Sequence, residues 1–75
     1  MNDYTINVAQ IEEYQTIRNI DELEIIFARA KSTIVNGEKV FLVRKFADGR
    51  QEKFDEFSTL DELDQYKNTV FKYLG

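Results

Sequence analysis

Residues 38–57, EKVFLVRKFADGRQEKFDEF, contain two runs of strand-forming residues separated by Asp48-Gly49. An Asp-Gly pair between such runs is a strong short-range signal of a β-hairpin. Residues 40–43 are apolar at every position, which is typical of a strand that lies inside a sheet rather than at its edge. The sequence therefore predicts an antiparallel hairpin over residues 38–57 whose first strand is central.

The turn of this hairpin is compatible with two registers. A three-residue loop at residues 47–49 pairs Arg44 with Glu52, whereas a two-residue loop pairs Lys45 with Glu52. Each register gives an opposite-charge pair worth a few tenths to about 1 kcal/mol, so the sequence does not choose between them.

The second strand of the hairpin carries an irregularity. Phe54 and Phe57 have opposite parity, so a regular strand cannot place both on one face. This indicates a bulge near residues 55–56, or a chain that leaves the strand before Phe57.

A capped helix is predicted on each side of the hairpin. Asn19 and Thr59 are favoured N-cap residues, and Glu22 and Glu62 follow three residues later, which is the spacing of a capping box. Apolar residues then recur every three to four positions. The predicted helices cover residues 20–35 and 59–74.

The end of the first helix has two interpretations. Asn36-Gly37 suits a C-terminal cap, but it also suits a tight hairpin turn; the apolar stripe that reaches Ile34 favours the cap. Ile25 and Phe71 lie off the main apolar stripes of the two helices. They indicate either a partner contact or two helices that pack side by side.

The N-terminal segment is ambiguous. Residues 4–8 alternate between apolar and polar, as in a half-buried strand. Asn7 could equally cap a helix over residues 8–17 that places Val8, Ile11 and Tyr14 on one face.

A comparison within the chain favours the strand. Residues 14–24, YQTIRNIDELE, align with residues 54–64, FDEFSTLDELD, at a shift of 40. Because Phe54–Phe57 is predicted to end a strand, we expect Tyr14–Ile17 to do the same. Two such units are too few for a solenoid, and two capped helices that converge on one pattern explain the similarity better than a duplication.

These elements predict one α+β domain over residues 1–75. We expect a small two-layer sandwich in the order β-α-β-β-α, with helices 20–35 and 59–74 on one face of the sheet. The alternative makes residues 8–17 helical and gives three helices plus one hairpin.

Composition and charge narrow the class of protein. Of the 75 residues, 43% are hydrophobic and 13% are aromatic, which is enough to form a small core. The net charge of −4 disfavours nucleic acid and anionic membrane surfaces as partners. No apolar run is long enough to span a membrane, no signal peptide is evident, and there is no Cys, so we expect a cytoplasmic protein.

The sequence contains no convincing catalytic, cofactor or metal motif, and we predict a non-enzymatic protein. No His or Cys is present, so the Ser and Thr residues lack the usual base. The paired acids suit solvated helix starts, and the three glycines do not form a phosphate loop. An enzyme would require a pocket lined by two or more carboxylates.

Basic and aromatic residues gather on the hairpin, which is the candidate binding surface. We predict a small binding domain whose partner is another protein or a second copy of the chain. The alternative is nucleic-acid binding through this mildly basic face, by stacking of bases on the aromatic rings. The candidate residues are Lys39, Phe41, Val43, Arg44, Lys45, Arg50 and Lys53.

Overall fold

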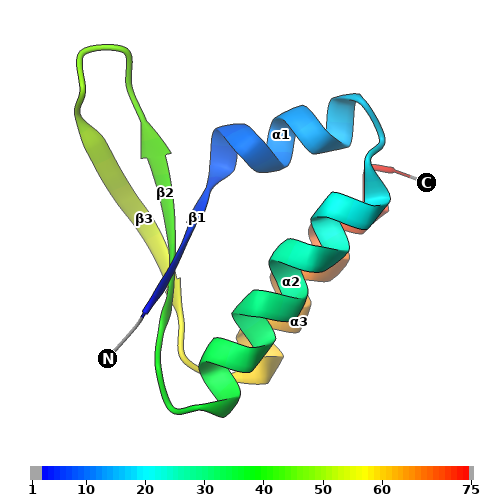
Figure 1. Cartoon of the computed structure of the whole chain (residues 1–75), viewed down its shortest axis with the longest axis vertical. Helices are drawn as coiled ribbons and strands as arrows, with labels where there is room; N and C mark the ends of the chain where they lie inside the picture. The colour runs from blue at the N-terminus through cyan, green and yellow to red at the C-terminus, as the bar shows by residue number, and fades with distance from the viewer. Residues whose placement is uncertain (1–2, 75) are drawn as a thin grey trace.

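The computed structural model describes residues 3–74, which form a mixed three-stranded sheet and three helices on one of its faces (Figure 1). The sheet order is β1-β2-β3, with β1 parallel and β3 antiparallel to the central β2. The predicted two-layer α+β class and the central position of the first hairpin strand are thus confirmed. The elements are β1 (Tyr4–Asn7), α1 (Val8–Thr16), α2 (Ile20–Val35), β2 (Val40–Lys45), β3 (Gln51–Phe57) and α3 (Leu60–Lys72).

The hairpin adopts the register of the three-residue loop. Arg44 lies opposite Glu52, and the Phe46 N–H donates to the Arg50 carbonyl at 2.8 Å. Gly49 has a φ of 90°, the left-handed conformation that this loop requires and that glycine adopts readily.

The irregularity in β3 lies one residue before the expected position. Leu42 pairs with Asp55, but the next residue, Val43, pairs with Lys53. Phe54 is therefore the extra residue that has no opposite neighbour on β2. The bulge lets the strand continue to Phe57, so the alternative in which the strand ends earlier is wrong.

Helix α2 has the predicted cap at each end. The Asn19 side chain accepts a hydrogen bond from the Glu22 N–H at 3.2 Å. At the other end the Gly37 N–H donates to the Ile34 carbonyl at 2.9 Å, and the N–H of residue 38 donates to the Thr33 carbonyl at 3.0 Å. With Gly37 at a φ of 84°, this is a Schellman motif, and the hairpin interpretation of residues 36–37 is wrong.

Residues 8–16 are helical, so the strand predicted for residues 14–17 is wrong. Asn7 ends β1 and caps α1, since its side chain accepts from the Ala9 N–H at 3.0 Å. Val8 and Ile11 are then buried on one face of α1, as the helical alternative expected. The observed order is β-α-α-β-β-α, which keeps the first strand of one prediction and the extra helix of the other.

The core lies between the sheet and the helices. α2 and α3 run side by side against the sheet, and α1 connects one end of the sheet to the start of α2 (Figure 1). The Tyr66 ring of α3 stacks on Phe57 of β3, with ring centroids 5.4 Å apart. The buried cluster comprises Ile6, Val8, Ile11, Leu23, Ile26, Phe27, Ala30, Ile34, Val40, Leu42, Phe57, Leu63 and Val70.

Candidate functional site

The second face of the sheet carries the predicted binding surface. Side chains alternate along β2, and Val40 and Leu42 belong to the core beneath the helices. Phe41 and Val43 therefore point to the opposite face, and Val43 is buried without belonging to that core. The side of β2 that the helices leave uncovered is therefore this face.

Five of the seven candidate residues share this face. Lys39 precedes β2 with the same parity as Phe41, and Lys45 follows Val43 by two positions. Lys53 lies opposite Val43 on β3. We name this group the open-face patch; it consists of Lys39, Phe41, Val43, Lys45 and Lys53.

The Lys53 side chain covers the aromatic ring of the patch. The Lys53 ammonium lies 4.9 Å from the centroid of the half-buried Phe41 ring, a cation–π contact. The aliphatic stems of such lysines shield apolar surface while their charged ends remain in water. The patch therefore presents cationic groups around a small apolar centre rather than a bare hydrophobic surface.

Glu56 holds two lysines of the patch in place. Its carboxylate lies 3.0 Å from the Lys53 ammonium and 3.3 Å from the Lys39 ammonium. Hydrogen bonds from Lys53 and Lys39, together with their charges, lower the pKa of Glu56 below its ordinary value. These ion pairs are exposed and contribute little to stability, but they fix where the two ammonium groups lie.

Lys45 stands at the other end of the patch. Among the described residues it makes no ion pair, unlike Lys39 and Lys53. It borders a shallow polar depression of about 600 Å³ where the sheet face meets α1. This depression is lined by Thr5, Asn7, Ala9, Gln10, Glu13, Lys45 and Gln51.

The two remaining candidates lie elsewhere. Arg44 has the parity of Leu42 and reaches α1 on the helical side, where it pairs with Glu12 at 3.1 Å. Arg50 lies in the hairpin turn, where it pairs with Asp48 at 2.6 Å and stacks over the Phe46 ring at 4.9 Å. Both guanidinium groups are engaged within the chain, and neither belongs to the open-face patch.

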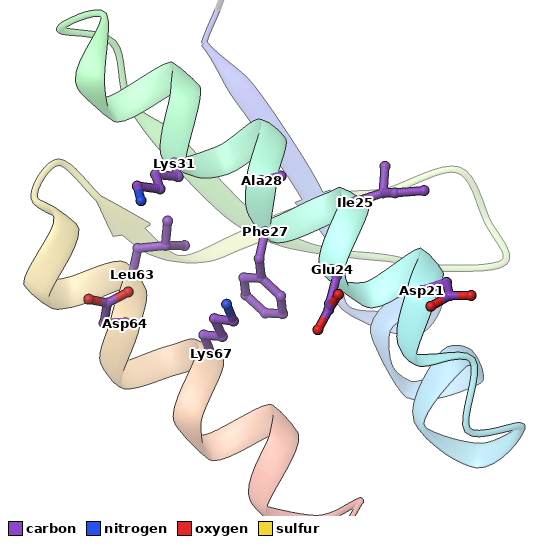
Figure 2. Close-up of a pocket in the computed structure, with 9 residues that line it drawn as sticks. All are labelled: Asp21, Glu24, Ile25, Phe27, Ala28, Lys31, Leu63, Asp64 and Lys67. Carbon is purple, nitrogen blue, oxygen red and sulfur yellow. The ribbon is translucent and has the colours of Figure 1, made fainter.

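A second surface feature is a groove of about 650 Å³ between α2 and α3 (Figure 2). Phe27 and Leu63 form its apolar floor, and charged side chains rise from both helices. Its three carboxylates are exposed, whereas acid–base catalysis relies on a carboxyl that is desolvated in a cleft. The lining residues are Asp21, Glu24, Ile25, Phe27, Ala28, Lys31, Leu63, Asp64 and Lys67.

The two off-stripe residues of the helices have different surroundings. The Phe71 ring packs on Phe27, with centroids 5.9 Å apart, so the side-by-side packing of the helices explains it. Ile25 stays 46% exposed at the edge of the groove. The partner-contact interpretation therefore stays open for Ile25 alone.

The sequence prediction missed two contributors to these surfaces. Glu56 was not among the candidates, although it lies opposite Phe41 and organises the lysines around that ring. Its role follows from the register across the bulge, which the sequence left open. Ala28 of the groove was missed because a small, exposed helical residue carries no sequence signal.

The fold and these surfaces define a small two-layer α+β domain with a cationic sheet face. No family model, curated protein or solved structure matches the chain. Within residues 3–74 no helix is long and apolar enough to cross a membrane. In the same residues no group of three or more acids is arranged to hold a metal ion.

Proposed function

We infer that the chain is a non-enzymatic binding domain whose open-face patch binds an acidic segment of a partner protein. The observation that carries this proposal is the gathering of Lys39, Lys45 and Lys53 on the sheet face that no described helix covers. The three lysines of the open-face patch and the carboxylate of Glu56 together carry a charge of +3 − 1 = +2, whereas the chain carries −4.

The chemistry of the patch selects the class of partner. Ammonium groups attract carboxylates and speed their encounter, and the half-buried Phe41 ring offers a small apolar contact between them. A peptide that alternates acidic and apolar side chains matches this arrangement. The lack of cysteine suits a reducing compartment, so the proposal includes a cytoplasmic location.

The protein-binding proposal is favoured over nucleic-acid binding by the state of the aromatic ring. Base stacking needs an accessible ring face, but the Lys53 ammonium already lies over Phe41. The net negative charge of the chain also opposes a polyanion with many phosphates.

NMR titration of the ¹⁵N-labelled chain with a synthetic peptide of alternating Glu and Leu tests the proposal. We expect amide shifts confined to residues 39–45 and 51–56, which weaken as salt is added. Lys45→Glu should abolish them, and Lys72→Glu, which changes an exposed lysine on α3, should leave them intact.

Three results contradict the proposal. One is the absence of shifts at millimolar peptide, and a second is a set of shifts that lies away from the patch. The third is a response of the patch to single-stranded oligonucleotides at low salt but not to the peptide, which would support the nucleic-acid alternative.

A further inference from the structure

The outward side of α2 carries a stripe of apolar and small residues. Ile25, Ala28, Ser32 and Val35 recur at spacings of three, four and three on the side away from the buried stripe. Ile25 is 46% exposed and Val35 is 66% exposed. A helix that needs only its inner face for the core has no intramolecular use for these side chains.

The groove beside this stripe can receive an apolar side chain. Ala28 lines the groove between α2 and α3, together with Phe27 and Leu63 (Figure 2). Because Ala28 has only a methyl group, a neighbouring helix can approach closely at this point. Ile25 lies at the edge of the same groove, one helical turn away.

The charges along α2 are separated by sign. Asp21 and Glu24 lie in its first half, and Arg29 and Lys31 lie in its second half. Among residues 3–74, the ion pairs lie on the sheet, in the hairpin turn and between β2 and α1, and none involves these four side chains. The outward part of α2 therefore carries charged side chains of both signs that form no ion pair with the rest of the described chain.

We propose that a second copy of this chain docks on this side, with the two α2 helices antiparallel about a twofold axis between Ile25 and Ala28. A twofold contact uses the same patch on both copies, so the patch must be complementary to itself. The antiparallel arrangement places Ile25 of each copy on Ala28 of the other, at the mouth of the groove. It also places Glu24 of each copy beside Lys31 of the other.

The order of the charges determines the orientation. Glu24 and Lys31 are seven residues apart, so they lie on the same flank of α2. A parallel twofold pair places this flank of the two copies on opposite sides of the interface, whereas the antiparallel pair places it on the same side and brings Glu24 beside Lys31 twice. Two helices of 16 residues make a small interface, so we expect a weak dimer whose population depends on protein concentration.

This inference is independent of the proposed function, because α2 packs on one face of the sheet (Figure 1), whereas Phe41 and Val43 of the open-face patch point to the other face. Lys45→Glu, which tests the sheet face, should leave the dimer unchanged. The two proposals can therefore fail separately.

Sedimentation velocity over a concentration series tests the dimer. We expect the wild-type chain to shift from monomer to dimer as its concentration rises, and Ile25→Asp to stay monomeric. Ile17→Asp is the matched control, since Ile17 is 61% exposed and lies outside the stripe. Circular dichroism confirms that each variant is folded.

Charge reversal tests the orientation. Glu24→Lys and Lys31→Glu should each prevent self-association at low salt, because each places like charges together twice. An equimolar mixture of the two variants should form heterodimers, since the pairs then combine Lys with Glu at both contacts. A wild-type monomer at all concentrations, a dimer indifferent to Ile25→Asp, or a mixture that stays monomeric would overturn the proposal.

Discussion

Residues 14–24 and 54–64 share one sequence pattern but adopt different structures. Residues 14–17 end helix α1, whereas residues 54–57 end strand β3, although both then lead into a capped helix. The apolar residues at equivalent positions differ in burial: Phe57 is 4% exposed, whereas Ile17 is 61% exposed.

The difference comes from the neighbours of each segment. Phe57 lies opposite Val40, so the central strand supplies backbone partners for β3. Residues 14–17 continue a helix that Asn7 starts and that Ile11 anchors in the core. A local pattern of spacing is thus compatible with both structures, and tertiary packing selects one of them.

The largest expected effect is the contrast between Phe57→Ala and Ile17→Ala. Truncation of a buried Phe costs about 3–5 kcal/mol, whereas truncation of an exposed residue usually changes stability by less than about 0.5 kcal/mol. Urea denaturation followed by circular dichroism measures both. Phe57→Leu keeps the comparison measurable if Phe57→Ala does not fold, and equal losses at the two positions would contradict the explanation.

Alkaline pH should destabilise the packing of α3 on β3, because it ionises the partly buried Tyr66. Burial, reinforced by the charges of Glu12 and Asp55, raises the pKa of Tyr66 from 10.0 to about 12. The folded state therefore binds the phenol proton more tightly than the unfolded state does. The stability that this difference adds is fully present below pH 10.0 and is lost as the pH rises through about 12.

The alkaline effect is measured as a difference between variants. Urea midpoints of the wild type should fall more steeply above pH 10.0 than those of Tyr66→Phe, which has no ionisable group at this position. Tyr73→Phe is the control, because Tyr73 is 78% exposed and its removal should not change the slope. Parallel slopes for the wild type and Tyr66→Phe would argue against the burial of the phenol.

Helices α2 and α3 should respond differently when the glutamate three residues after the N-cap, Glu22 or Glu62, is replaced by alanine. The Glu62 carboxylate accepts from the N–H groups of Ser58 at 3.1 Å and Thr59 at 3.2 Å, which completes a capping box. In α2 the Asn19 N–H already donates to the Tyr14 carbonyl at 2.9 Å, so Glu22 has no equivalent role.

Glu62→Ala should therefore lower the thermal midpoint, and Glu22→Ala should leave it nearly unchanged. The hydrogen bond from the Ser58 N–H, followed by that from the Thr59 hydroxyl, lowers the pKa of Glu62. The contribution of the Glu62 carboxylate to stability is present above the ordinary pKa of a glutamate and disappears as the pH falls through the lowered pKa. The difference between the two variants should consequently vanish in acid, and a difference that persists there would point to another cause.

Much of the fold could be predicted because it rests on local signals. Asp48-Gly49, the caps at Asn19 and Thr59, and Gly37 each specify a turn or a helix end through their own backbone or side-chain chemistry. A helix over residues 8–17 was predicted only as the alternative because its pattern also suits a strand, and the packing of Ile11 in the core decides between them.

The candidate site was predicted in part for the same reason. Strand parity places Lys39, Phe41 and Val43 together once the hairpin is accepted. Arg44 can be excluded from the patch only when the position of α1 is known, because Arg44 pairs with Glu12 of α1 on the helical side of the sheet. The role of Glu56 requires the position of the bulge, and neither feature follows from the sequence alone.

The smallest expected change in stability compares the turn before α2, at Arg18, with the turn before α3, at Ser58. Arg18 has a φ of 55°, and it occupies the position in the Schellman motif of α1 that Gly37 occupies in that of α2. The left-handed conformation costs a residue with a Cβ roughly 1–2 kcal/mol, of which the greater flexibility of unfolded glycine offsets a part. Arg18→Gly should therefore stabilise the chain by about 0.5 kcal/mol.

The equivalent change in the other segment should have the opposite sign. Ser58, 40 residues later, is not among the described non-glycine residues with positive φ. Ser58→Gly thus relieves no strain and adds flexibility to the unfolded chain, which costs about 0.5–1 kcal/mol. Urea midpoints of both variants measure the two changes, and a shift of the same sign at both positions would show that backbone strain at Arg18 does not separate the turns.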